Sequence, residues 1–110
     1  MRAATAVLAV ISLATWSSSP AADSGPCSRP EFRQFDFWVG EWEVVDAEGR
    51  PAGRNSITLE QNGCAIMERW VSAKGGTGFS LNHYDPSSGR WKQHWVGLGL
   101  MLEMRGGLRD

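Results

Sequence analysis

The chain has 110 residues, enough for one small domain. Lysine and arginine total 11 and aspartate and glutamate total 12, so the net charge is −1. This balance excludes the basic surface typical of a nucleic-acid-binding protein. After the N-terminal region, no stretch is long and apolar enough to enter a membrane.

Residues 1–21 have the pattern of a secretory signal peptide. Arg2 is followed by an apolar run from Ala3 to Ala14, and then by small residues that suit cleavage before Ala22. The run is too short for a permanent membrane anchor. A buried N-terminal helix is the alternative, but no polar face interrupts the run. The sequence therefore predicts a periplasmic or secreted protein, with no membrane attachment after the signal is removed.

Residues 22–34 are rich in proline and serine and are predicted to form an N-terminal arm. This arm contains Cys27, and the other cysteine is Cys64. Because an exported protein meets an oxidising compartment, we expect a Cys27–Cys64 disulfide. A reactive free thiol is the alternative, but neither a Cys-x-x-Cys motif nor a nearby histidine supports it.

The stretch FDFWVGEWEVVD (35–46) combines two periodicities. Phe35, Trp38 and Trp42 would share one face of a helix, whereas Trp42 and Val44 would share one face of a strand. Both patterns fit if each applies to half of the stretch. We therefore expect a helical turn up to about residue 39, a strand over 41–46, and a pivot at Gly40, since glycine tolerates unusual backbone conformations.

The rest of the chain alternates short β-type segments with turn signals. Turn signals include DAEGRPAG (46–53), the Asn-Gly pair in QNG (61–63), AKGG (73–76) and PSSG (86–89). Short strands at this spacing, with no long helical pattern, indicate an all-β antiparallel meander. The six expected strands cover residues 41–46, 54–60, 64–72, 77–85, 90–97 and 98–106.

These motifs resemble those of the calycin superfamily. The helical turn before Gly40-Glu41-Trp42 fits its Gly-x-Trp motif, and FDFWVGEWEV, NGCAIMERW and LNHYDPSSGRW together resemble an uncharacterised family of exported bacterial proteins with a lipocalin-like β-barrel. The resemblance covers about residue 27 to the end. It implies that Trp42 has a structural role across one end of the barrel, and the family carries no established reaction.

The chain departs from this resemblance in its number of strands. Lipocalin-like barrels usually need eight or more strands to hold a ligand. We therefore expect residues 35–110 to form a calycin-like domain that is incomplete at its C-terminus. Pairing of the open edges in a homodimer is the alternative.

A candidate metal site lies on the hairpin around the YDPSSGRW turn. If Asp85 pairs with Arg90, then His83 lies opposite Lys92 and Leu81 opposite His94, so the two imidazoles are diagonal neighbours on one face. A third ligand is missing, and zinc sites normally have three or four protein ligands. We expect no metal and no cofactor.

The other face of the same strands carries a candidate ligand site. Tryptophan and tyrosine side chains alternate there with polar ones, which suits a small apolar or amphipathic ligand held by a few polar contacts. Simple filling of a small barrel is the alternative. Glu68 is costly to bury without a partner, and Arg54 is its expected partner, ahead of a ligand. The predicted ligand-binding residues are Glu68, Trp70, Asn82, Tyr84, Trp91, Gln93 and Trp95.

Catalytic motifs are weak. Glu41 and Glu43 share a strand face instead of flanking a scissile bond, and the GGTG segment (75–78) is not followed by the residues of a phosphate loop. No nucleophilic triad is visible, and no catalytic residue is assigned. The sequence therefore predicts an exported binding protein for a small apolar ligand, without catalysis. The alternatives are a protein-interaction module that pairs through exposed strand edges and, less favoured, a cavity enzyme with Glu68 as acid or base.

Overall fold

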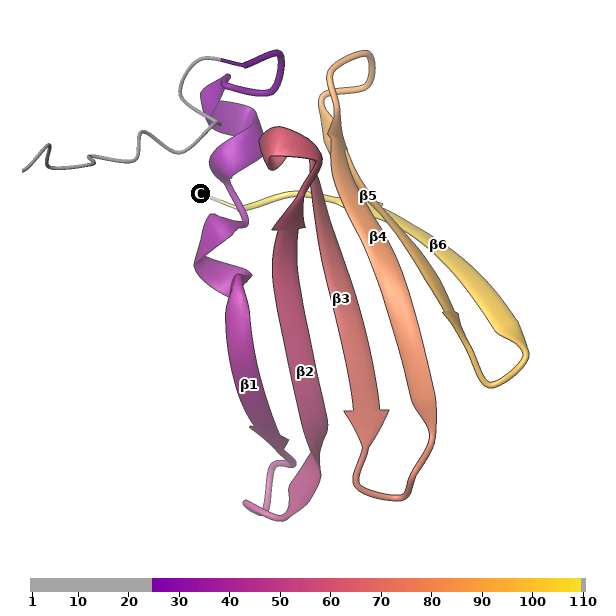
Figure 1. Ribbon diagram of the computed structural model, residues 1–110. Helices are drawn as coiled ribbons and strands as arrows, with labels where there is room; N and C mark the ends of the chain where they lie inside the picture. The colour runs from indigo at the N-terminus through magenta and orange to yellow at the C-terminus, as the bar shows by residue number, and fades with distance from the viewer. Residues whose placement is uncertain (1–24, 110) are drawn as a thin grey trace, which may run out of the picture.

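The computed structural model describes residues 25–109, which form one six-stranded antiparallel sheet in the order β1-β2-β3-β4-β5-β6 (Figure 1). The predicted signal peptide, residues 1–21, lies outside the described residues. No helix within residues 25–109 is long and apolar enough to cross a membrane. The strands are β1 (Gly40–Val45), β2 (Pro51–Glu60), β3 (Ala65–Ser72), β4 (Thr77–Asp85), β5 (Arg90–Gly97) and β6 (Leu100–Gly106).

The predicted all-β antiparallel meander is confirmed, since every strand pairs with its neighbour in sequence. The sheet is twisted and does not close into a barrel, so β1 and β6 are its two edges within the described residues. The predicted membership of the calycin superfamily stays a prediction.

β4 and β5 match the predicted boundaries, β1 lies one residue earlier than predicted at both ends, and β2, β3 and β6 differ at their first residue. β2 begins at Pro51, not at residue 54, because the turn is completed over 46–50, where the backbone N–H of Asp46 donates to the carbonyl of Arg50. Cys64 is not in β3; it follows a 3-10 turn, η4 (Gln61–Gly63), that lengthens the predicted Asn-Gly hairpin. β6 begins at Leu100 because Leu98 and Gly99 have positive φ angles and form the turn.

The predicted hinge in FDFWVGEWEVVD is present. A short 3-10 turn, η3 (Asp36–Trp38), is followed by Val39 and by β1, which starts at Gly40. Gly40 has a φ angle of +144°, which side-chain-bearing residues rarely adopt. The chain therefore turns from the helical segment into the sheet at this glycine.

The strand register divides the sheet into two faces with different chemistry. We call the face that carries Ile57, Glu68 and Ser80 the inner face, since these residues are paired across β2, β3 and β4. Charged side chains gather on the opposite, outer face, where Glu43 pairs with Arg54 at 3.5 Å. By register, Glu68 is the one aspartate, glutamate, lysine or arginine that the six strands place on the inner face.

Side-chain interactions on the outer face also stabilise the turn between β4 and β5. The Nζ atom of Lys92 lies 2.8 Å from the carboxylate of Asp85, which also accepts hydrogen bonds from Ser87 and Ser88. The interaction with Lys92, followed by those with the two serines, holds the pKa of Asp85 well below its usual range. The predicted pairing of Asp85 with Arg90 is confirmed.

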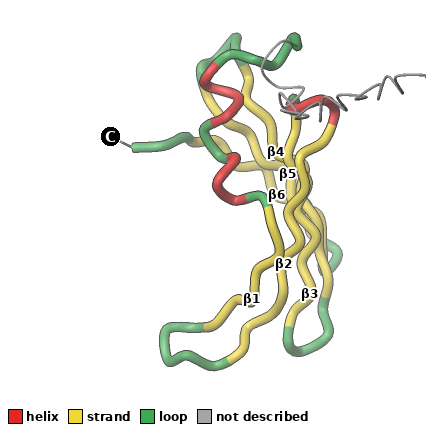
Figure 2. Tube along the Cα trace, turned by 60° about the vertical axis from the view of Figure 1, so that its left-hand side comes forward, coloured by secondary structure: helices red, strands yellow, loops and turns green. Residues whose placement is uncertain are grey.

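The core lies where the N-terminal segment crosses the inner face (Figure 2). Ile57, Ile66 and Trp91 are buried there, and Phe35 packs edge-on against Trp91 with ring centroids 4.9 Å apart. The indole nitrogen of Trp91 donates to the carbonyl of Glu31 at 3.2 Å. The first residues of the domain therefore act as a cover over one end of the sheet.

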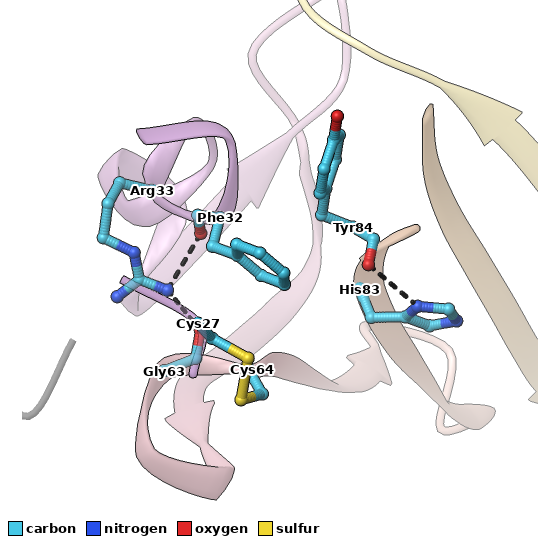
Figure 3. The surroundings of a disulfide bond; sticks show 7 residues. All are labelled: Cys27, Phe32, Arg33, Gly63, Cys64, His83 and Tyr84. Atoms are coloured by element: carbon cyan, nitrogen blue, oxygen red, sulfur yellow. Dashed lines mark hydrogen bonds between the residues drawn. A yellow bond between two sulfur atoms is a disulfide. The ribbon is translucent and has the colours of Figure 1, made fainter. Parts of the chain in front are cut away.

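The predicted Cys27–Cys64 disulfide is present and fixes this cover to the start of β3 (Figure 3). A second 3-10 turn, η2 (Pro30–Arg33), follows Cys27 and buries Phe32, whose ring lies 5.3 Å from that of Tyr84. The Arg33 guanidinium donates to the carbonyls of Phe32 and Gly63. Part of the predicted arm, from Cys27 onward, is thus packed against the sheet.

Candidate functional site

The structure places all predicted ligand-binding residues on the inner face of β3, β4 and β5. The pairs Tyr84–Trp91, Asn82–Gln93 and Ser80–Trp95 lie directly across β4 and β5, as the predicted register requires. They do not form one pocket, however. They divide into a polar cluster, an aromatic cavity, two indoles that lie farther along the sheet, and Tyr84, which packs against Phe32 under the N-terminal cover.

The polar cluster consists of Asn55, Glu68, Ser80, Asn82 and Gln93. Glu68 is 9% exposed, and its Oε1 atom accepts hydrogen bonds from Ser80 Oγ at 2.7 Å and from Gln93 Nε2 at 3.2 Å. Its Oε2 atom accepts a hydrogen bond from Asn55 Nδ2 at 2.7 Å. Asn82 extends the cluster by donating to Ser80 Oγ. A buried carboxylate is therefore held by neutral donors alone within the described residues.

The predicted pairing of Glu68 with Arg54 is wrong. Arg54 and Glu68 lie on opposite faces of the sheet, since Arg54 is paired with Val71 in β3, and Glu68 is paired with Ile57 in β2. The alternation of side chains along a strand prevents their contact. In place of an arginine, Asn55 on the inner face of β2 contacts Glu68.

The aromatic cavity has a volume of about 390 Å³ and lies between the N-terminal cover and the end of β6. Asn82, Trp91 and Gln93 from the predicted set line it, so the cavity borders on the polar cluster. Lys92 and Arg105 also border the cavity, although the register assigns their side chains to the outer face. The lining residues that the site prediction missed include Phe35, Phe37, Trp38 and Met104.

The missed lining residues come from the two ends of the domain. The aromatic side chains of FDFWVGEWEVVD could have indicated that this segment lines the cavity, because the segment carries more of them than a hinge needs. Nothing in the local sequence places that segment beside Met104, which is far away in the chain. Figure 2 shows the N-terminal segment and the C-terminal end on the same side of the sheet.

Trp70 and Trp95 lie outside the aromatic cavity and occupy positions next to glycines of the inner face. A Cβ atom added at Gly78 or Gly97 would lie under 3.0 Å from ring carbons of Trp95, and one added at Gly53 would meet the ring of Trp70 in the same way. The indoles thus occupy the space that side chains at these glycines would fill. Both indoles are partly exposed and extend the inner face beyond the polar cluster.

Replacing Gly78 with alanine should therefore lower the free energy of unfolding by about 1–3 kcal/mol, because Trp95 must leave its position. Gly106→Ala in β6 is the matched control, since a Cβ atom there meets nothing within 4 Å. Urea unfolding followed by tryptophan fluorescence measures both variants. Equal stabilities would show that Trp95 does not depend on the space at Gly78.

Trp42, which the resemblance assigns to one end of a barrel, lies on the edge strand β1 and is 43% exposed. Its indole nitrogen donates to the carbonyl of Trp38 at 2.6 Å. This contact connects β1 to the 3-10 turn that precedes Gly40.

The two histidines lie together on the outer face, as the register predicts. The rings of His83 and His94 are stacked, with centroids 5.6 Å apart and an interplanar angle of 6°, and His94 lies 3.5 Å from Glu103. Within residues 25–109, no three His, Cys, Asp or Glu side chains are grouped so that they could hold a metal ion. The stacked pair therefore has no complete ligand set around it in this part of the chain.

Apolar side chains are also exposed on the outer face and on the β6 edge. A groove of about 650 Å³ is lined by residues that include Met67, Val71, Phe79, Val96 and Leu98. Every residue of β6 is exposed. Another chain would associate with the protein through these apolar surfaces.

Comparisons of the chain with known protein families, with curated proteins and with solved structures found no match. The fold and site define the chain as a disulfide-linked antiparallel β-sheet protein with an aromatic cavity on its inner face. Its function is inferred from this geometry.

Proposed function

We propose that this chain is an exported protein that binds a small apolar or amphipathic molecule on the inner face of its sheet, without catalysing a reaction. The observation that carries the proposal is the aromatic cavity of about 390 Å³ bordered by the side chains of Asn82 and Gln93. Binding sites for small molecules are usually of this size and combine an apolar lining with a few polar groups.

The polar cluster supports binding over simple core filling. Burying a carboxylate costs free energy that an apolar residue of similar size would not. Glu68 is nevertheless buried at the centre of the inner face, next to the amide of Gln93 that also lines the cavity. Departures of this kind from a fully apolar core are expected at functional sites.

The same cluster favours recognition over catalysis. Three neutral donors, Asn55, Ser80 and Gln93, hold both carboxylate oxygens of Glu68. A carboxylate fixed in this way is suited to accept hydrogen bonds from a ligand at a constant position. The disulfide supports export, because such bonds persist mainly in oxidising compartments.

Binding is tested with N-phenyl-1-naphthylamine, an uncharged apolar dye whose fluorescence rises in apolar surroundings. We expect saturable binding to the mature chain, and Met104→Arg should weaken it by about tenfold or more, which corresponds to about 1.4 kcal/mol. Met101→Arg is the matched control, because Met101 lies on the outer face of the same strand and is 71% exposed. The absence of saturable binding, or equal loss in both variants, would refute binding in this cavity.

A second candidate function is association through exposed strand edges. The β6 edge favours it, because Leu100, Met101, Leu102 and Met104 are all exposed there, and unpaired edges of this kind recruit further strands. Native mass spectrometry of the mature chain distinguishes the two functions. A stable dimer without bound ligand would favour association, whereas a monomer that retains a small molecule would favour binding.

A further inference from the structure

The charge of Glu68 has no counterion on the inner face. No lysine or arginine nitrogen within residues 25–109 lies within 4.0 Å of its carboxylate, and its three partners are neutral side chains. The other acidic and basic residues of the strands lie on the outer face by register. The inner face therefore carries one buried negative charge that a bound cation would neutralise.

Hydrogen-bond acceptors next to this charge are unused. Asn55 is 9% exposed, its Nδ2 atom donates to Glu68, and its Oδ1 atom is buried with no hydrogen-bond partner. A carboxylate offers about four acceptor positions, of which Glu68 uses three. Unused acceptors beside an uncompensated carboxylate match a ligand that brings several N–H donors and a positive charge.

The indoles next to these acceptors suit a cation as well. Asn55 is paired in the sheet with Trp42 on one side and Trp70 on the other, and Trp95 is paired with Ser80 of the polar cluster. Tryptophan is the side chain whose ring face attracts cations most strongly. The acceptors and the partly exposed indoles of Trp70 and Trp95 therefore belong to one continuous region of the inner face.

We infer that the molecule bound on the inner face carries a protonated amine, held by Glu68 Oε2 and Asn55 Oδ1 and flanked by the indoles of Trp70 and Trp95. This inference rests on the proposed function and narrows the ligand to one class, a small apolar amine. The apolar part of such a ligand extends past Gln93 toward the aromatic cavity, because Gln93 contacts Glu68 and also lines that cavity.

The test compares 2-phenylethylamine with 2-phenylethanol on the mature, disulfide-bonded chain. The two probes have the same ring and linker and differ in the ammonium and hydroxyl groups. Calorimetric titration at pH 7 should show at least about tenfold tighter binding of the amine. On addition of the amine, the side-chain amide NMR signals of Asn55 and the indole signals of Trp70 and Trp95 should shift.

Glu68→Gln should reduce the preference for the amine over the alcohol to within about twofold. The substitution removes the negative charge, and the new side-chain amide N–H donates a hydrogen bond to Asn55 Oδ1 in place of the ligand. Glu43→Gln is the matched control, since Glu43 lies on the outer face and its side chain is 81% exposed. This variant should keep the preference of the native chain. The comparison of the two probes and the NMR shifts need no variant, so they decide the inference even if Glu68→Gln does not fold.

Three results would overturn the inference: equal affinity for the two probes, no binding of the amine to a chain that binds N-phenyl-1-naphthylamine, or a preference that survives Glu68→Gln. Each of these leaves the binding of apolar molecules intact. Failure of the dye itself to bind would instead refute the proposed function. The two failures are therefore distinguishable.

Discussion

Glu68→Leu should lower the free energy of unfolding by about 2–5 kcal/mol, because it leaves two buried hydrogen-bond donors without their acceptor. Leucine would leave Asn55 without its side-chain hydrogen bond and would deprive Ser80, which is 0% exposed, of its acceptor. A buried donor without a partner costs about 1–3 kcal/mol. Urea unfolding of the purified mature variant measures the loss.

Two further variants separate the effect of losing the hydrogen bonds from the effect of introducing an apolar side chain. Glu68→Gln keeps an acceptor for Ser80 and should cost about 1–2 kcal/mol, in line with the loss of a charged partner. Glu43→Leu on the outer face should change stability by about 0.5 kcal/mol or less, as exposed substitutions usually do. A Glu68→Leu variant as stable as the native chain would show that the polar cluster does not contribute to folding.

Replacing both cysteines with serine should lower the free energy of unfolding by about 3–4 kcal/mol. The disulfide closes a segment with a sequence separation of 37 residues, and this estimate follows from the chain entropy that such a loop loses in the unfolded state. In a domain whose total stability is on the order of 5–15 kcal/mol, this loss is large. Release of Cys27 should also loosen the packing of Phe32 on Tyr84.

Chemical reduction of the native chain is the control for the cysteine replacement, because it opens the same loop without changing the side chains. The urea concentration at the midpoint of unfolding should be similar for the reduced and the doubly substituted protein. Both midpoints should lie well below that of the oxidised protein. Fluorescence of Trp91, which packs under the N-terminal cover, should report the same transition. Identical midpoints before and after reduction would mean that the cover holds without the covalent bond.

The proposed binding function of the inner face and the stability of the domain depend on the same residues. Glu68 is held by hydrogen bonds that stabilise the sheet, yet its charge has no counterion within the described residues. A bound amine would supply that counterion and raise stability in proportion to its affinity and concentration. Ligand binding and thermal stability should therefore rise together in this protein.

The sequence by itself determined the local features of this protein. Alternation of side chains and turn residues placed β4 and β5 at their observed boundaries, and the YDPSSGRW turn set the pairing of Asp85 with Arg90. The Gly40 pivot was predictable because only glycine readily accepts the required φ angle. The disulfide followed from two cysteines and the predicted signal peptide. Each of these features depends on neighbours in the chain or on the simplest possible pairing.

Only the tertiary structure decided which partners meet across the sheet. Side-chain alternation gives the face of each residue within one strand, but the relative faces of β2 and β3 depend on their register, which placed Asn55 and not Arg54 beside Glu68. The aromatic cavity likewise joins Phe35 and Met104 from opposite ends of the domain. The curvature of the sheet and the path of the N-terminal cover bring them together, and neither is encoded in a short stretch of sequence.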